Sequence, residues 1–430
     1  MCGQTRISGE SVNYSKLLDG TTYTAGWVLE SLRTNDPVFK EEFGSRKVKD
    51  VTSYDISKGK GFASIVLKCT VIFEDSADED DVYSTILKVP GFASLNETNS
   101  KGTDLIEVDK VKEKNIQHHN FECEFYKDVV PHLKNFPTPK AFDTVKWVLN
   151  QQEGCIHMED LTPKGKVFDY FDSFNIIQIK NIIGHLARMH KQLWTMDQQI
   201  WREKFIESQT TFAEIMDGIM TSMETMEEMA KERFPSIIPL IQKYRKFCSS
   251  REFMKYGFSQ SYKDLNLDPV VVHGDMWASN IIFSTNKDGD IENNVVGLID
   301  WQLIHEGSPM DDIVRLFVIT LDGNTRRQAE SSLLQYYLDV LTSEFLSENR
   351  QVPCTFKQMQ EAYDYIFMVQ AALPIFLTVF HGRNLNECRE FDSINRAKVD
   401  KVILRSLHVF EDLDKLLTGK YKHLFEKFGK

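Results

Sequence analysis

Two short apolar runs enclose a polar loop in the second half of the chain. The first run leads directly into His-Gly-Asp at residues 273–275, and Asn280 follows five positions after Asp275. The second run, residues 295–299, ends on Asp300. Short apolar runs between turn signals are typical of buried strands. We therefore expect the two strands to hold one carboxylate, one amide and a second carboxylate around a single point.

These three polar residues suit magnesium-assisted phosphoryl transfer. In that chemistry one Asp orients the attacking hydroxyl and accepts its proton, while an amide and a second carboxylate hold Mg²⁺. Asp275 is the candidate base, and Asn280 and Asp300 are the candidate metal ligands. Each residue alone is common at a helix cap, in a turn or at a strand end. All three at this spacing, between apolar strands, favour the functional interpretation. His273 is expected to brace the loop by hydrogen bonds.

The two parts of the chain differ in pattern. Residues 47–90 are rich in branched and aromatic residues, which is typical of strands, whereas most segments beyond residue 170 show helical spacing. We therefore expect an α+β fold with a small sheet-containing N-lobe, residues 1–160, and a larger, mainly helical C-lobe, residues 161–430. Helices are expected at residues 121–133, 175–193, 203–234, 326–345 and 397–417.

Charge and composition exclude several classes of function. The 430 residues carry a net charge of −12, and nucleic acid is therefore not an expected partner, because neutralising phosphates requires clustered Lys and Arg. The seven cysteines show no Cys-x-x-Cys pair, which favours a reducing compartment. The first residues lack the apolar core of a signal peptide, so a cytoplasmic protein is expected. The apolar stretch 365–380 is too short to span a bilayer and predicts one buried helix.

Glycines and a lysine in the first half suit a phosphate site. Gly59 and Gly61 precede a long predicted strand, and backbone N–H groups at such a turn can approach phosphate closely. Ser64 adds a hydroxyl donor. A hairpin with two glycines is usually only a hairpin. Its position upstream of Lys88, which is flanked by apolar residues in the next strand-like run, strengthens the functional interpretation.

The polar loop and its flanking strands resemble the catalytic loop of the aminoglycoside phosphotransferase and choline kinase superfamily of small-molecule kinases. The chain is most similar to the choline-kinase-like group, which includes insect ecdysteroid 22-kinases and many nematode proteins. Trp301 after Asp300 fits that superfamily better than the Asp-Phe-Gly of protein kinases, and His-Gly-Asp differs from their His-Arg-Asp. The likeness covers about residues 50–315 and implies a two-lobed protein-kinase-like fold.

The resemblance also implies a set of nucleotide contacts. Lys88 would contact the α- and β-phosphates of ATP and pair with an acid on the following helix. Glu122 matches the family's Glu-x-x-x-Tyr pattern, and Glu124 is the alternative. Backbone groups around Met158, Glu159 and Leu161 would bind the adenine edge.

Two further features are Asp312 and a methionine-rich segment at residues 216–229. By the same resemblance, Asp312 would support the catalytic loop. Five methionines between residues 216 and 229 either line an acceptor pocket or form the buried face of a helix.

The sequence thus predicts a phosphotransferase that uses ATP and Mg²⁺ and acts on a hydroxyl of a small molecule, which could be choline-like, ecdysteroid-like or xenobiotic-like. Two alternatives stay open. The chain could be a pseudokinase that binds a nucleotide or metabolite without turnover, or it could be a protein kinase. The acceptor and the oligomeric state stay undetermined.

Overall fold

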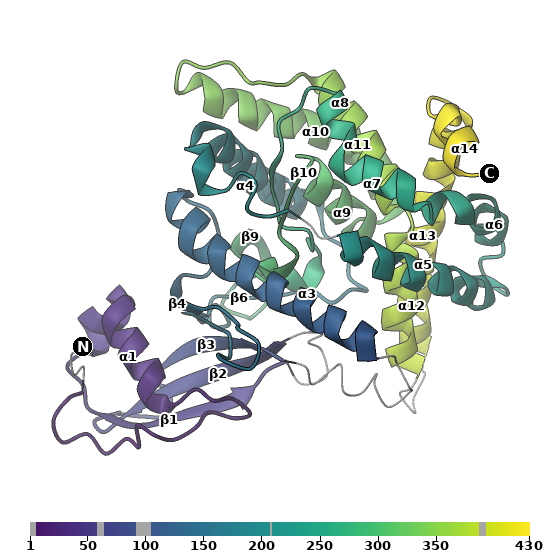
Figure 1. The fold of residues 1–430 in the computed structure, drawn as a ribbon. Coiled ribbons are helices and arrows are strands. Elements are labelled where there is room, and N and C mark those ends of the chain that lie inside the picture. The colour runs from purple at the N-terminus through teal and green to yellow at the C-terminus, as the bar shows by residue number, and fades with distance from the viewer. Residues whose placement is uncertain (1–5, 58–63, 92–104, 207–208, 387–392) are drawn as a thin grey trace. The chain divides into compact units, whose positions relative to one another are not determined.

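The computed structural model describes residues 6–57, 64–91, 105–206, 209–386 and 393–430. Two compact units are present: unit 1 comprises residues 1–131 and 138–164, and unit 2 comprises residues 132–137 and 165–430. The first unit combines a sheet with helices, and the second is mainly helical (Figure 1). The predicted α+β, kinase-like fold class is confirmed by this architecture.

Unit 1 is built on an antiparallel five-stranded sheet in the order β1-β2-β3-β5-β4 (Figure 1). Its strands are β1 (Val48–Asp55), β2 (Ser64–Phe73), β3 (Val82–Pro90), β4 (Ala141–Val145) and β5 (Cys155–Glu159). Its helical segments are α1 (Ala25–Asn35), η1 (Phe39–Phe43), α3 (Leu105–Glu124) and η2 (Phe125–Val129), with η3 (Val130–His132) directly after them. The helix predicted at 121–133 is therefore the end of a longer one, followed by irregular helical turns.

The core of unit 1 follows from the alternation of side chains along its strands. In β2, residues Leu67, Cys69, Val71 and Phe73 are buried at every second position, as expected for a strand with one covered face. Apolar residues of α1 belong to the same buried cluster. The side chain of Thr24 caps α1 by accepting the backbone N–H of Trp27, which fixes where the helix begins.

Unit 2 is mainly helical, with two small antiparallel sheets in the orders β10-β7 and β6-β8-β9. The strands are β6 (Gly165–Lys166), β7 (Val270–Val272), β8 (Ile281–Thr285), β9 (Ile291–Leu298) and β10 (His305–Gly307). The α-helices are α4 (Ile176–Thr195), α5 (Gln209–Ala230), α6 (Ile237–Cys248), α7 (Arg251–Ser259), α8 (Ser261–Asp264), α9 (Asp311–Thr320), α10 (Gly323–Leu346), α11 (Phe356–Gln370), α12 (Leu373–Asn386), α13 (Ser393–Thr418) and α14 (Lys422–Phe428). Three short helical turns complete it: η4 (Gln198–Ile200), η5 (Ala278–Asn280) and η6 (Trp301–Leu303).

The apolar stretch 365–380 is not one helix, so that prediction is wrong. It is divided between α11, which ends at Gln370, and α12, which begins at Leu373. Pro374 is the second residue of α12, where the missing N–H of proline costs no intrahelical hydrogen bond. Among the described residues, no single helix is long and apolar enough to cross a membrane, although α11 and α12 pass that test as a bent pair.

Several methionine side chains in the second half of α5 pack inside unit 2. Met223 and Met226 are fully buried, and α5 lies against α12. Met229 also faces α12, because a Cβ added at Gly382 would lie 3.2 Å from its Cε atom. These contacts favour the interpretation of a buried helix face for this part of the stripe.

Candidate active site

The polar loop of unit 2 is fixed to helix α9 by one carboxylate. Asp312, in the first turn of α9, accepts the backbone N–H of His273 at 2.8 Å and that of Gly274 at 3.0 Å. Asp312 is buried, with 2% of its surface exposed. Two charge-assisted bonds to consecutive amides hold the loop more firmly than neutral bonds would. Asp312 thus anchors the backbone of the polar loop.

His273 braces the loop from inside. Its Nδ1 accepts the backbone N–H of Asp275 at 3.1 Å, and its Nε2 lies 2.9 Å from the carbonyl oxygen of Ile299. Because Nδ1 is an acceptor here, the proton of the neutral ring belongs on Nε2 and is donated to Ile299. The ring also packs on Trp301, with centroids 4.5 Å apart. One imidazole therefore ties the backbone of Asp275 to the residue that precedes Asp300.

Only glycine fits at position 274. Gly274 has a φ of +79°, and a Cβ added there would lie 2.2 Å from the carbonyl oxygen of Leu303. A side chain would require both a left-handed backbone and displacement of the neighbouring main chain. The turn that aims Asp275 consequently depends on this glycine.

Asp275 and Asn280 contact each other directly. The Asn280 amide nitrogen Nδ2 donates to the Asp275 backbone oxygen at 2.9 Å and to its carboxylate Oδ2 at 3.0 Å. The short helix η5 ends at Asn280 and provides the tight return that brings the two side chains together. Because Nδ2 is used in this way, Oδ1 is the amide atom left to act as a ligand.

Asp300 reaches the same place from the end of β9. Ile281 pairs with Leu298, and the backbone N–H of Ile299 donates to the carbonyl oxygen of Asn280 at 3.0 Å. Asp300 itself has a left-handed backbone, with φ 66° and ψ 64°. That conformation is uncommon for residues with a Cβ and is often retained at functional sites. The structure therefore brings Asp275, Asn280 and Asp300 together, within unit 2.

Burial and four neighbours set the pKa of Asp275. Removal of its carboxylate from bulk water raises the pKa of Asp275 to about 6, while the Arg315 guanidinium opposes this rise and the charge of Asp300 adds to it. The Asn280 amide donates to this carboxylate, and both Asn280 and the Trp277 side chain favour its ionised form. Asp275 keeps 25% of its side chain exposed, so a small molecule can reach it.

In unit 1, Lys88 and Glu122 form a buried ion pair. Lys88 Nζ lies 2.6 Å from Glu122 Oε2, and the two side chains are 9% and 1% exposed. Glu124, the alternative partner, instead pairs with Lys146 at 2.5 Å. The separation follows from helical geometry, because residues two apart on α3 point about 200° away from each other.

The other predicted nucleotide contacts of unit 1 lie at strand ends. Ser64 begins β2 and pairs with Pro90 at the end of β3, two residues beyond Lys88. Met158 and Glu159 end β5, where Met158 pairs with Ile86. Gly59 and Gly61 lie outside the described residues.

The segment after β5 is anchored by an acid that the sequence analysis did not select. Asp160 forms an ion pair with Lys68 at 2.9 Å and accepts the Thr162 backbone N–H at 2.8 Å. Burial alone would raise the pKa of Asp160, but bonds from Thr162, Lys68 and Ser84 hold it below its ordinary value. An ionised Asp160 fixes the main chain on both sides of Leu161.

Arg315 is the second site residue that the sequence analysis missed. Its Nη1 lies 3.3 Å from Asp275 Oδ1. The available signal was its position three residues after Asp312 on a helix, which places both side chains on one face. Nothing in the sequence alone shows that this face meets the loop 40 residues earlier.

The fold and this loop define a protein of the kinase-like class. The chain belongs to the DUF1679 family, whose family model, described as "Uncharacterized oxidoreductase dhs-27", matches residues 39–417. The Caenorhabditis elegans protein of that name is 26% identical over 364 residues, which are 83% of this chain and 42% of the relative. This chain therefore spans less than half of that protein.

A kinase-like relative matches along most of its length. The Caenorhabditis elegans "Uncharacterized kinase-like protein D1044.1" is 22% identical over 377 residues, 85% of this chain and 94% of that protein. The predicted resemblance to choline-kinase-like proteins is confirmed.

Two solved structures also match along most of their length. Choline kinase from Cryptosporidium parvum has a TM-score of 0.49 and 12% identity, covering 92% of this chain and 98% of that one. A putative aminoglycoside phosphotransferase from Ralstonia eutropha has a TM-score of 0.45 and 13% identity, covering 90% of this chain and 98% of the other.

Proposed function

We propose that this protein is a phosphotransferase that uses ATP and Mg²⁺ to phosphorylate a hydroxyl group of a small molecule. The observation that carries the proposal is the proximity of Asp275 and Asn280, on a loop held by Asp312, to Asp300 at the end of β9. A partly exposed carboxylate beside an amide oxygen and a second carboxylate is the arrangement that phosphoryl transfer to an alcohol requires.

The residues fit a magnesium ion. Among the described residues, no cluster of three or more His, Cys, Asp or Glu side chains could hold a metal. Mg²⁺ does not need such a cluster, because it takes one or two protein carboxylates and fills its remaining positions with water and phosphate oxygens. Asp300 and the Oδ1 atom of Asn280 would supply the protein ligands. When bound, the ion would neutralise charge on the transferred phosphate.

The loop residues would then act in a defined order. Asp275 would orient the acceptor hydroxyl and take its proton as the hydroxyl oxygen bonds to the γ-phosphorus. The bond from that phosphorus to the β–γ bridging oxygen breaks, and ADP leaves with the electron pair. Asn280 keeps Asp275 in place by donating to its carboxylate. Positioning and charge stabilisation supply most of the rate in this class of reaction.

Unit 1 supplies residues suited to the nucleotide. Glu122 holds the Lys88 ammonium group in a fixed position, where it would contact the α- and β-phosphates. Ser64 and the glycines at 59 and 61 would add donors to phosphate oxygens. Main-chain groups of Met158, Glu159 and Leu161 would bind the adenine, and the Asp160 anchor would keep that segment in position.

The oxidoreductase activity that the name of one relative suggests is not favoured for this chain. Dinucleotide-dependent oxidoreductases of the common doubly wound type bind their cofactor on a parallel sheet. Every strand pair in the described residues is antiparallel. The polar loop also lacks the glycine-rich turn that follows the first strand of that fold.

An acceptor screen tests the proposal. Radiolabelled ATP and Mg²⁺ would be incubated with the protein and with choline, ethanolamine, a hydroxysteroid, an aminoglycoside or casein. Label on one of the small molecules, absent with Asp275→Asn protein, supports the proposal. Label on casein alone would favour a protein kinase. Nucleotide binding without label on any acceptor would favour a pseudokinase.

A further inference from the structure

Helix α9 meets the catalytic loop through two side chains of opposite charge. Asp312 holds the loop backbone, and one turn later Arg315 points its guanidinium at the Asp275 carboxylate, with Nη1 and Oδ1 3.3 Å apart. The base of the proposed reaction is therefore already paired with a cation. A base that is to accept a proton gains nothing from a permanent ion pair, so this arginine needs an explanation.

Arg315 is poorly satisfied where it stands. A charge-assisted N–H···O bond is usually about 2.7–2.9 Å long, and guanidinium–carboxylate pairs are often bidentate. Arg315 makes one contact at 3.3 Å. Its Nε is buried and has no hydrogen-bond partner among the described residues. A guanidinium carries five N–H donors. The buried Nε is left unpaired at a cost in free energy, and the other donors that do not face Asp275 remain for water or a ligand.

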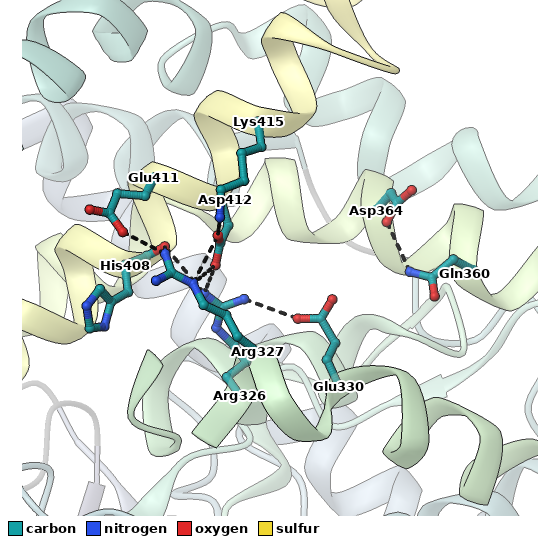
Figure 2. A network of polar contacts seen from close by, with 9 residues as sticks. All are labelled: Arg326, Arg327, Glu330, Gln360, Asp364, His408, Glu411, Asp412 and Lys415. Atoms are coloured by element: carbon teal, nitrogen blue, oxygen red, sulfur yellow. Dashed lines mark hydrogen bonds and ion pairs between the residues drawn. The ribbon is translucent and has the colours of Figure 1, made fainter. Parts of the chain in front are cut away.

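Two structural arginines of the same unit make more contacts, most of them shorter, than Arg315 does. Figure 2 shows Arg326 and Arg327 of α10 surrounded by acceptors, most of them on α13. Arg326 bonds Asp412 at 2.5 Å and Glu330 at 3.1 Å. Arg327 bonds Asp412 at 2.8 Å and Glu411 at 2.7 Å. Each of these two arginines also donates to the carbonyl oxygen of His408. Arg326 and Arg327 thus each contact two carboxylates and a carbonyl oxygen, whereas Arg315 makes one long contact with a single carboxylate.

We propose that Arg315 is an oxyanion receptor: its unused N–H donors bind a phosphate-like or carboxylate-like group beside the acceptor hydroxyl. The side chains of Arg315 and Asp275 are 15% and 25% exposed, so a ligand can reach both. An arginine fork matches the geometry of such a group. When the oxyanion binds, the Arg315 guanidinium pairs with it and its interaction with Asp275 weakens. The Asp275 carboxylate is then available to the acceptor hydroxyl.

The oxyanion has two possible sources, and this part rests on the proposed function. It is either the phosphoryl group in transfer or an anionic group carried by the acceptor. In the first case Arg315 neutralises charge that spreads over the phosphoryl oxygens in the transition state. In the second case it selects acidic alcohols. Both sources present a tetrahedral or planar oxyanion to the arginine. Titrations with nucleotide analogues distinguish one source from the other.

Titration calorimetry with inorganic phosphate, without nucleotide, tests the receptor itself. Because Asp275 competes for the guanidinium, Asp275→Asn should bind phosphate about tenfold more tightly than wild type. Adding Arg315→Gln to that variant should remove the gain, and Arg315→Lys should restore part of it. The control is Arg188→Gln, which removes another singly paired arginine, bonded to Glu344 at 3.1 Å on the surface, and should leave phosphate binding unchanged.

The same titration in the presence of nucleotides identifies the source. With Mg²⁺ and the non-hydrolysable analogue AMP-PNP bound, the γ-position is occupied. Loss of phosphate binding with AMP-PNP, but not with ADP, assigns Arg315 to the transferred phosphoryl group. Retention with both assigns it to an anion on the acceptor.

Two results would contradict the assignment of Arg315 as an oxyanion receptor. Asp275→Asn protein that is folded by circular dichroism and does not bind phosphate at high millimolar concentration would contradict it, as would equal binding by the Arg315→Gln double variant. Failure of AMP-PNP and ADP to bind at all would instead count against the proposed function, because the titrations without nucleotide judge Arg315 alone.

Discussion

Lys88 and Glu122 form an ion pair that is almost completely removed from solvent, with Nζ and Oε2 2.6 Å apart. Removing one member of such a pair leaves a buried charge and costs about 3–5 kcal/mol of stability. Lys88→Met should therefore lower the free energy of unfolding by an amount in that range and weaken ATP binding. Urea denaturation and titration calorimetry measure the two effects separately.

A double variant separates stability from function at this pair. Lys88→Met with Glu122→Leu replaces both charges by apolar groups, which is often neutral for stability. Its unfolding midpoint should return towards wild type, while its affinity for ATP should stay low. Wild-type affinity in the double variant would show that Lys88 does not contact the nucleotide.

Asp275→Asn keeps the size of the side chain and removes the proposed base. We expect transfer to fall by about 10²–10⁴-fold, with nucleotide affinity little changed, since the protein ligands proposed for the metal remain. Steady-state kinetics with the acceptor found in the screen would measure this loss. Asp288→Asn, at an exposed position in the β8–β9 turn, is the matched control and should retain full activity. Robust turnover by the Asp275 variant would remove the base assignment.

Gly274→Ala should damage the loop. The added Cβ would lie 2.2 Å from the Leu303 carbonyl oxygen at a φ of +79°, so both strain and displacement are expected. A loss of about 1–3 kcal/mol in unfolding free energy follows, together with most of the activity. Gly184→Ala is a suitable control, because in helix α4 the new Cβ would meet only the ends of two side chains, Arg188 Nη1 at 3.2 Å and the Tyr336 hydroxyl at 3.4 Å. Equal stability of the two variants would contradict the constraint at Gly274.

Asp312 predicts a pH dependence of stability. Burial raises the pKa of this carboxyl from 3.8 to about 6, Asp311 adds to the rise, and the N–H groups of His273 and Gly274 oppose it. Between about pH 4 and pH 6 the folded state therefore binds more protons than the unfolded state. This group's contribution to stability is greatest below pH 4, falls as the pH rises through that window, and levels off above the folded pKa.

Comparison with Asp312→Asn isolates this effect from other titrating groups. The difference in unfolding free energy, wild type minus variant, should decrease by roughly 2–3 kcal/mol from pH 4 to pH 7. Urea denaturation at several pH values would measure it. A difference that is constant or grows with pH would show that Asp312 does not have a raised pKa.

Sequence patterns predicted the parts of this protein that depend on local signals. The spacing of Asp275 and Asn280 placed both on one loop, and the branched and aromatic composition of residues 47–90 predicted strands. The helical period predicted α4 within two residues at each end. In each case the chain itself carries the information, because neighbouring positions share one element.

Other features depend on contacts between distant segments. The strands β4 and β10 are short and lack a clear alternation, and they exist because β5 and β7 offer edges to pair with. The left-handed backbone of Asp300 has no sequence signal, since Asp is compatible with many conformations. The contact between Arg315 and Asp275 joins residues 40 positions apart. Residues 365–380 were predicted as one continuous helix, because their apolar composition outweighed Pro374. The structure divides them between α11 and α12.

The most direct test of the account is calorimetric titration of ATP with and without Mg²⁺, on wild type and on Asp300→Asn. Asn tolerates the left-handed backbone of residue 300, so the variant removes one charge and little else. The account predicts that wild type binds ATP more tightly when Mg²⁺ is present, and that the variant loses most of this dependence. Failure of folded wild-type protein to bind ATP at millimolar concentration, or identical Mg²⁺ dependence in the two proteins, would contradict it.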